Sequence, residues 1–176
     1  MNSFENLPDL QREQLLDLAN RFTTKVVDTK GNLKGNAFIA DGRVISAHHV
    51  VDGDYVIYNS QIGPGVMFEQ VQNQDIAESP RQLRVSGLKR AKNQGDGQKV
   101  YLISRDKDNI PLVVSGEIMT MGPIHRGKIE VSVDRQQMTE ILNGMSGSAV
   151  TNLSGEAIGV LVQARMGGKG LMEPFK

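Results

Sequence analysis

This chain contains a serine between glycines and, about a hundred residues before it, a pair of histidines. These are its candidate catalytic residues. Ser146 lies in the run Gly144-Met145-Ser146-Gly147, and His48 and His49 lie in Ser46-Ala47-His48-His49-Val50. A serine hydroxyl becomes a good nucleophile at neutral pH when an imidazole takes its proton, and a carboxylate holds that imidazole in the correct tautomer. The two motifs therefore suggest a serine nucleophile and its general base.

Asp75 is the carboxylate that we expect beside His49. In Asn73-Gln74-Asp75-Ile76-Ala77 it opens a short apolar run, and a polar residue in that position can lie at a barrel edge that faces the histidine. Asp52 and Asp54 are alternatives, although they lie so close to His49 in the chain that the turn would have to fold back for either to reach it.

The glycines around the serine could supply a second part of such a site. Glycine reaches backbone conformations that other residues avoid, so the amides of Gly144 and Ser146 can point at one spot. Two amides aimed at one oxygen stabilise the oxyanion of a tetrahedral intermediate. Gly144 and Ser146 are therefore the expected oxyanion hole.

The order of these residues along the chain separates the serine hydrolase architectures. All histidines of the chain precede Ser146, so the Ser, Asp, His order of α/β-hydrolases cannot be built on this serine. A subtilisin-like order would use Asp28 or Asp41 as its carboxylate, but the long helices of that fold are not visible in the sequence. His49, Asp75 and Ser146 follow one another in the order His, Asp, Ser, which is the natural order for these residues.

Composition argues against several other classes of function. The 176 residues carry 20 basic and 20 acidic side chains, so no net field favours nucleic acid or an anionic membrane. There is no cysteine, and His125 has no companion at metal-ligand spacing. The run 122–129 nearly matches a phosphate-binding loop, but Ile129 stands where that loop needs serine or threonine. We expect no nucleic acid, no membrane, no metal and no cofactor.

Length and the N-terminal residues bear on domain count and location. With 39% hydrophobic residues, the chain is long enough to bury the core of one domain and too short for several. The start Met1-Asn2-Ser3-Phe4-Glu5 has no basic segment followed by an apolar one, and no run of eighteen apolar residues occurs. The expectation is a cytoplasmic protein, encoded by a cell or by a virus in its host cell.

Residues 7–22 form the one helix that the sequence predicts. Leu15, Leu18, Ala19 and Phe22 recur at helical spacing, and Pro8 suits a first turn. We expect this apolar stripe to pack on the rest of the fold; a docking surface for a partner or for a second copy is the alternative.

The remainder of the chain predicts a closed all-β fold. Its 19 glycines and turn signals such as Asp41-Gly42 separate many short β-rich runs, which two six-stranded Greek-key barrels would accommodate. Loops are expected at 61–81 and 89–98, and 167–170 is interpreted as a flexible tail or a loop beside the cleft. The predicted strands are 24–28, 37–40, 44–46, 55–58, 83–86, 100–104, 111–119, 128–133, 148–152 and 157–163.

These motifs resemble those of the trypsin/chymotrypsin-like serine peptidase superfamily. Ser46-Ala47-His48-His49-Val50-Val51 is similar to the family's Thr-Ala-Ala-His-Val-Val, and Gly144-Met145-Ser146-Gly147-Ser148 to its Gly-Asp-Ser-Gly-Gly. The register with the two valines favours His49 over His48 as the base. Asp75 follows His49 by 26 residues and precedes Ser146 by 71, which resembles the compact HtrA-like, glutamyl-endopeptidase-like and viral members.

The resemblance implies a domain organisation and a specificity pocket. It implies an N-terminal helix over 1–23 and a peptidase domain over 24–176, with one barrel at about 24–90 and the other at about 98–166. Residues just before the nucleophile and on the opposing strand would line the pocket, and its apolar members favour a small or medium aliphatic substrate residue. Glu140 would favour lysine or arginine if it pointed inward. The expected pocket residues are Glu140, Ile141, Leu142, Asn143, Val162, Gln163 and Ala164.

The function that the resemblance implies is a serine endopeptidase with a polypeptide substrate. Two alternatives stay open: a binding or scaffold module whose triad is present but not engaged, and a viral protease that cleaves its own polyprotein. Met145 replaces the aspartate that zymogen-activated relatives carry before the nucleophile, so activation by trimming of the N-terminus is not expected.

Overall fold

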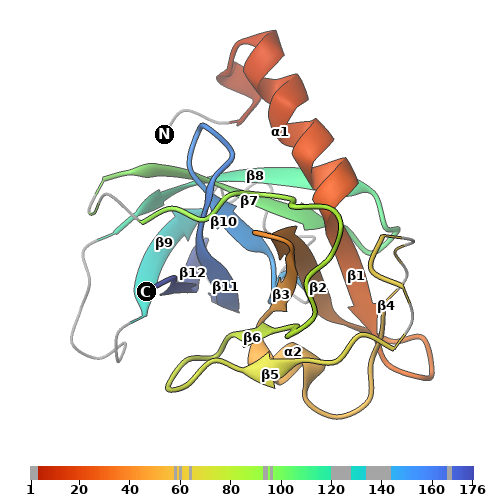
Figure 1. Cartoon of the computed structure of the whole chain (residues 1–176). Coiled ribbons are helices and arrows are strands. Elements are labelled where there is room, and N and C mark those ends of the chain that lie inside the picture. The colour runs from red at the N-terminus through yellow and green to blue at the C-terminus, as the bar shows by residue number, and fades with distance from the viewer. Residues whose placement is uncertain are drawn as a thin grey trace.

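One long helix and two six-stranded sheets make up the fold (Figure 1). This computed structural model describes residues 4–57, 59, 61–63, 65–92, 95, 97–119, 128–133, 144–165 and 168–176. The helical elements are η1 (Phe4–Asn6), α1 (Asp9–Phe22) and the single turn α2 (His48–Val51). The strands are β1 (Thr23–Val27), β2 (Leu33–Ala40), β3 (Arg43–Ser46), β4 (Val56–Ile57), β5 (Glu69–Gln70), β6 (Ala77–Glu78), β7 (Lys99–Arg105), β8 (Pro111–Ile118), β9 (Ile129–Val133), β10 (Ala149–Thr151), β11 (Ala157–Arg165) and β12 (Lys169–Pro174).

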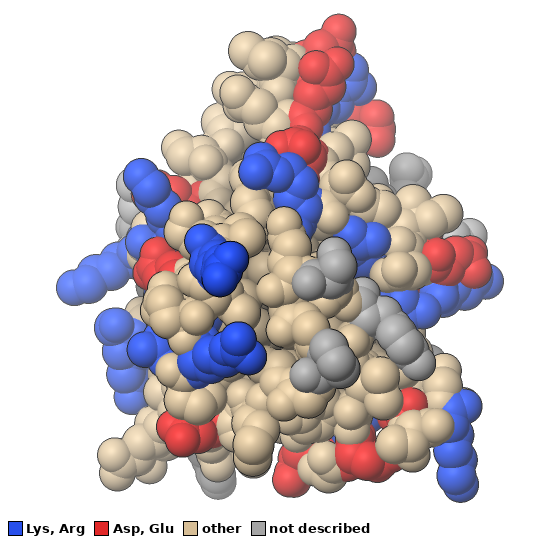
Figure 2. Space-filling model, turned by 45° about the vertical axis from the view of Figure 1, so that its right-hand side comes forward, with Lys and Arg blue, Asp and Glu red and all other residues tan. Residues whose placement is uncertain are grey.

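Helix α1 packs on the second sheet, as its apolar stripe predicts. Pro8 precedes the first helical residue with the φ of −54° that its ring imposes, and Leu15, Ala19 and Phe22 are buried against β7 and β8. The outer face of α1 is charged, with ion pairs between residues one helical turn apart, Arg12 with Asp9 and Arg21 with Asp17. Figure 2 shows acidic side chains gathered at the top of the view, where α1 stands.

The first sheet is antiparallel and has the strand order β4-β1-β2-β3-β6-β5. Its central hairpin turns at Asp41 and Gly42, which have φ of 49° and 76° between the paired residues Ala40 and Arg43. Two residues with positive φ form the turn type whose twist matches that of the flanking strands, and aspartate followed by glycine is a preferred sequence for it. The Asp41-Gly42 turn predicted from the sequence is therefore present.

The second sheet closes on itself as a barrel in the order β10-β11-β12-β9-β8-β7, with β7 paired back to β10. Strand β12 was not predicted from the sequence, where 167–170 was interpreted as a tail or loop. Its residues pair with β11 on one side and with β9 on the other, so the barrel reaches Pro174, beyond the expected end near residue 166. The all-β fold with two six-stranded barrel-like sheets and an N-terminal helix is confirmed.

Two further stretches differ from the expected strand pattern. The loop expected at 61–81 contains β5 and β6, which add the last two strands to the first sheet. Residues 83–86 form no strand; instead Leu83 N–H donates to Gly42 O, and Gly42 N–H donates to Ser86 O. Because both hydrogen bonds involve Gly42, the segment is bound to the β2–β3 turn and does not pair with a strand of the sheet.

Candidate active site

The short helix α2 presents His49 at the surface and anchors itself through apolar neighbours. Val50 is fully buried and Val51 nearly so, whereas half of the His49 side chain is exposed. Its ring Nδ1 lies 2.7 Å from Asp75 Oδ2, and its backbone N–H donates to Asp75 Oδ1 at 3.0 Å. An ionised carboxylate only accepts hydrogen bonds, so Nδ1 carries a proton, and in the neutral tautomer that this contact favours Nε2 keeps its lone pair.

Asp75 is the carboxylate that the structure places on His49. Partial burial raises the pKa of Asp75, but the hydrogen bonds and the charge interaction with His49, followed by the charge of Lys128, together lower it by more, to below its ordinary value of 3.8. His48 contributes only its backbone N–H, which donates to Asp75 O at 3.2 Å. Of the two histidines, His49 therefore has the ring that the carboxylate orients.

The rival carboxylates point elsewhere. Asp54 accepts two hydrogen bonds from Thr29, one from its amide and one from its hydroxyl, and Asp52 is exposed. The two candidates for a subtilisin-like order are also engaged away from the histidines: Asp28 binds the amides of its own turn, and Asp41 pairs with Arg90.

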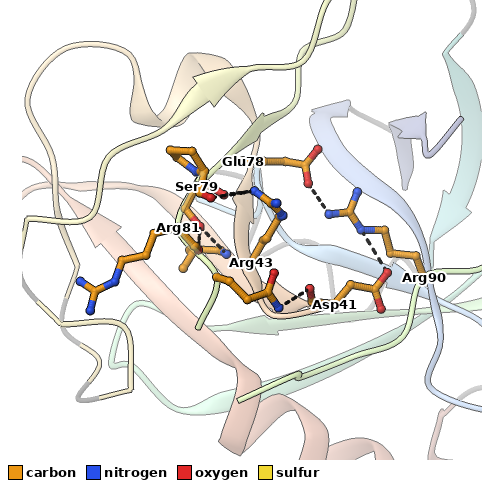
Figure 3. Close-up of polar contacts among 9 residues, drawn as sticks. Asp41, Arg43, Glu78, Ser79, Arg81 and Arg90 are labelled. Carbon is orange, nitrogen blue, oxygen red and sulfur yellow. Dashed lines mark hydrogen bonds and ion pairs between the residues drawn. The ribbon is translucent and has the colours of Figure 1, made fainter. Parts of the chain in front are cut away.

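A polar network holds the segment that follows Asp75 (Figure 3). Arg43 from β3 donates to the carbonyls of Ser79 and Pro80 at 3.1 and 3.0 Å, directly after β6. Glu78 in β6 is ion-paired with Arg90, whose Nε lies 3.5 Å from Asp41 Oδ2 across the same cluster. These contacts tie the end of the Asp75 segment to the β2–β3 hairpin and to the strand-linking segment around residue 90.

Glu173 supports Asp75 from the other barrel. Its side chain lies in β12 and is nearly buried, and Oε1 accepts the Asp75 backbone N–H at 3.0 Å. The neighbouring Gln74 reaches the same strand, because its Nε2 donates to Pro174 O at 2.8 Å. Strand β12 therefore fixes the loop that carries the carboxylate, a role for which the sequence offers no local signal.

Replacing Glu173 by leucine should loosen this loop, whereas glutamine should hold it. Glutamine keeps a side-chain oxygen that can accept the Asp75 amide proton, and leucine leaves that amide without its acceptor, a loss of about 1–3 kcal/mol. We expect amide hydrogen exchange at Asp75 to become on the order of 10-fold faster in Glu173→Leu and to stay near the wild-type rate in Glu173→Gln. Equal acceleration in both variants would show that the carboxylate's charge, rather than its acceptor oxygen, holds the loop.

Ser146 lies in a tight turn that only glycines allow. Gly144 and Gly147 have φ of 138° and 91°, in the left-handed region. A Cβ on Gly147 would lie 1.9 Å from Asn36 O. The Met145 side chain between them is fully buried in the apolar core of the second barrel, so no acidic group stands at this position.

Ser146 and the His49 helix meet around one residue of β2. A Cβ built on Gly35 would lie 2.5 Å from Ser146 O and 2.8 Å from a methyl carbon of Val50, the residue after His49. The absence of a side chain at Gly35 therefore allows the Ser146 turn, which precedes β10 of the second sheet, to approach α2, which carries His49.

The Ser146 hydroxyl is bonded to a backbone carbonyl and not to the histidine. Ser146 Oγ donates to Val162 O at 3.2 Å, and no hydrogen bond joins it to His49 among the described residues. Pairing of β11 with β12 shifts register between Leu161 and Gln163, which leaves Val162 outside the ladder. This bulge explains why the Val162 carbonyl is free to accept from the serine.

The expected oxyanion and pocket residues are described only in part. Gly144 and Ser146 lie in the turn, and within the described chain neither amide donates to an acceptor. Val162 is buried, Gln163 is exposed and Ala164 is half-buried on β11. The other four pocket residues, Glu140, Ile141, Leu142 and Asn143, lie outside the described residues, as does His125.

The described residues were also compared with what a metal site and a membrane-spanning helix require. The described residues contain no group of three or more His, Asp or Glu side chains that could hold a metal ion. None of the helices described is long and apolar enough to cross a membrane.

No protein-family model matches the sequence, and no curated protein matches it either. Solved structures do resemble the fold. The inactive form of the Rv3671c protease from M. tuberculosis is 19% identical, with a TM-score of 0.69 over 96% of this chain and 90% of that one. A human pathogenic astrovirus serine protease is 18% identical, with a TM-score of 0.65 over 90% and 91% of the two chains.

The third resemblance is to a larger protein. The HtrA-type protease AlgW, solved with a decapeptide, is 14% identical, with a TM-score of 0.67 over 92% of this chain; this chain spans 63% of the AlgW chain. All three proteins are described as proteases, and the astrovirus protein as a serine protease. Their likeness confirms that the fold is the chymotrypsin-like pair of barrel-like sheets expected from the sequence.

Proposed function

We propose that this chain is a serine endopeptidase that uses Ser146 as nucleophile, His49 as general base and Asp75 as the residue that orients the base. The observation that carries the proposal is the His49–Asp75 pair, with Nδ1 2.7 Å from the carboxylate, set beside the Ser146 turn in a chymotrypsin-like fold. That fold is shared with three proteases, one of them described as a serine protease and another solved with a decapeptide, which supports a polypeptide substrate.

The chemistry is acyl transfer to the serine and then to water. As Ser146 Oγ attacks the peptide carbonyl carbon, its proton passes to Nε2 of His49, and the oxyanion is stabilised by the amides of Gly144 and Ser146. The C–N bond then breaks as His49 returns the proton to the leaving amine. A water molecule, deprotonated by His49, attacks the acyl-enzyme, and Ser146 regains its proton when the acid leaves.

The resting contact of the nucleophile adds one step before this sequence. Ser146 Oγ must rotate from the Val162 carbonyl toward His49 Nε2, which gives up one hydrogen bond of 3.2 Å. The net contribution of a neutral hydrogen bond is only about 1 kcal/mol, so a bound substrate can readily offset it. The same contact favours the second candidate, a catalytically silent binding module on this fold.

A fluorophosphonate probe separates the two candidates. An activated serine attacks the phosphorus and displaces fluoride, whereas a serine without a base does not. We expect the wild-type chain to be labelled on Ser146 at neutral pH and the Ser146→Ala variant to stay unlabelled, as read by intact mass and peptide mapping. An unlabelled wild-type chain that still binds peptide would support the silent module.

The substrate residue on the acyl side of the cut bond, P1, should be small or medium aliphatic. Buried Val162 offers apolar contact, and Ile141 and Leu142 are the apolar residues just before the nucleophile turn. An apolar pocket discriminates single methylene groups by only ~1–3 kcal/mol, so we expect broad cleavage after Val, Ala, Leu and Met. A peptide library profiled at P1 measures this; a tenfold preference for Lys or Arg would place Glu140 in the pocket, and one for Glu would require a basic group there.

A further inference from the structure

Asn36 connects the first barrel to the nucleophile turn of the second. It lies in β2 and is fully buried, yet each of its polar groups has a partner. Its backbone N–H donates to Ser146 O at 2.8 Å, and its side-chain Nδ2 donates to Gly144 O at 2.5 Å. Its backbone O accepts from Ser46 Oγ at 2.6 Å, and its side-chain Oδ1 accepts from Arg105 N–H at 3.1 Å.

The partner of Oδ1 determines which way the Asn36 amide faces. Arg105 N–H is a donor, so the side-chain atom beside it must be the oxygen, and the amino group is left to face Gly144 O. Because the side chain is fully buried, flipping it would set a donor against a donor and an acceptor against an acceptor with no water to compensate. The orientation of the amide is therefore fixed by the protein.

These bonds restrain three successive peptide units of the turn. The carbonyl of Gly144 is held by Asn36 Nδ2, that of Met145 by Ser148 N–H at 3.0 Å, and that of Ser146 by Asn36 N–H. In a trans peptide the N–H points opposite to the C=O, so holding the Met145 carbonyl also aims the Ser146 N–H. Asn36 holds the units on either side of it.

Gly144 is the residue at which this restraint matters most. Glycine adopts a φ of 138° without steric strain, and it also adopts nearby φ and ψ values at little cost in free energy. Local chain geometry alone therefore leaves the turn free to reorient. The Asn36 side chain supplies the missing restraint, through a hydrogen bond that spans 108 residues of sequence.

We propose that the Asn36 side chain is a positioning residue for the oxyanion hole: it holds the Gly144–Met145 peptide so that the amides of Gly144 and Ser146 stay aimed at the substrate carbonyl. The inference rests on the proposed peptidase function. Asn36 touches no substrate atom and acts only through the turn, so its loss should affect transition-state stabilisation more than substrate binding.

The test compares Asn36→Asp, Asn36→Ala and Asn36→Ser with Thr151→Val. Aspartate keeps the shape and the oxygen that faces Arg105 but replaces the donor toward Gly144 with an acceptor; alanine removes both, and serine restores a small donor. Thr151 is a fully buried residue of β10 whose hydroxyl donates to Tyr101 O at 2.9 Å, so Thr151→Val removes a buried hydrogen bond of the second barrel without touching the turn.

In peptide hydrolysis we expect Asn36→Asp and Asn36→Ala to lower kcat roughly 10- to 100-fold and to change KM less than about threefold. This loss of kcat is smaller than the ~10²–10³-fold loss that removal of an oxyanion donor itself causes. Asn36→Ser should recover part of that loss. Thr151→Val should lower Tm about as much as Asn36→Ala does, and it should keep the wild-type kcat. A kcat within twofold of wild type in Asn36→Ala, or an equal loss in Thr151→Val, would overturn the proposal.

A second measurement uses the wild-type chain and does not depend on activity. NMR should detect a through-hydrogen-bond coupling between the Asn36 side-chain nitrogen and the Gly144 carbonyl carbon, and the Gly144 and Ser146 amide resonances should move in Asn36→Ala but not in Thr151→Val. Absence of both signals would reject the positioning role even if the enzyme is active. Their presence in a chain that neither cleaves peptide nor reacts with fluorophosphonate would reject the peptidase function and leave Asn36 as the residue that orders the turn.

Discussion

Replacing Ser146 or His49 by alanine should lower peptide hydrolysis by roughly three or more orders of magnitude while the protein stays folded. Ser146→Ala removes the attacking oxygen, and His49→Ala removes the imidazole whose Nδ1 lies beside Asp75. Neither side chain belongs to a buried core, since the His49 ring is half exposed and Ser146 is only partly buried. Initial rates on a peptide substrate, with Tm as the check on folding, measure the effect.

His48→Ala is the matched control for this prediction. His48 uses its backbone N–H to bind the Asp75 carbonyl, and alanine keeps that group. Activity within a fewfold of wild type is therefore expected. If His48→Ala abolished turnover and His49→Ala did not, the assignment of the base would be wrong. If the Ser146 and His49 variants both kept full activity, the peptidase proposal itself would fail.

Asp75→Asn should lower kcat by about 10⁴-fold, because it changes the tautomer of His49 rather than its position. Asparagine can turn its amino group toward Nδ1, which then keeps its lone pair and moves the ring proton to Nε2, the atom that must accept the serine proton. Glu173 still holds the backbone of residue 75, so the loop should remain in place. Single-turnover kinetics measure the loss, and ¹⁵N NMR of the imidazole reports which nitrogen carries the proton.

The same variant tests the electrostatics of the pair. The pKa of Asp75 is lowered in the folded protein, so the ionised carboxylate stabilises the fold above its unfolded pKa, near 3.8, and that contribution is lost as pH falls through the lower folded value. Between pH 5 and pH 2 the wild-type chain should therefore lose more stability than Asp75→Asn in urea unfolding. A parallel decline of the two proteins would contradict the assigned direction of the shift.

The residues of the proposed triad and the class of fold could be predicted from the amino-acid sequence. His49 and Ser146 stand out because serine beside glycine, and histidine before two valines, are local patterns tied to one chemistry. Strand and turn signals are equally local: the Asp41-Gly42 turn needs positive φ at two adjacent residues, and few residue types adopt it readily. Motifs, strands and turns that depend on residues adjacent in the chain can therefore be predicted from the sequence.

The contacts that hold those residues in place could not be predicted from the sequence and are seen only in the folded chain. Asn36 and Gly144 are separated by 108 residues of sequence, and Glu173 and Asp75 by 98. In the sequence, a polar residue that becomes buried cannot be distinguished from one that stays at the surface. Strand β12 was not predicted because the glycine-rich run 167–170 at its start was interpreted as a flexible tail or a loop, although pairing with β9 and β11 buries most of the strand. Long-range hydrogen bonds and barrel closure leave no local pattern, since their partners are brought together only by the fold.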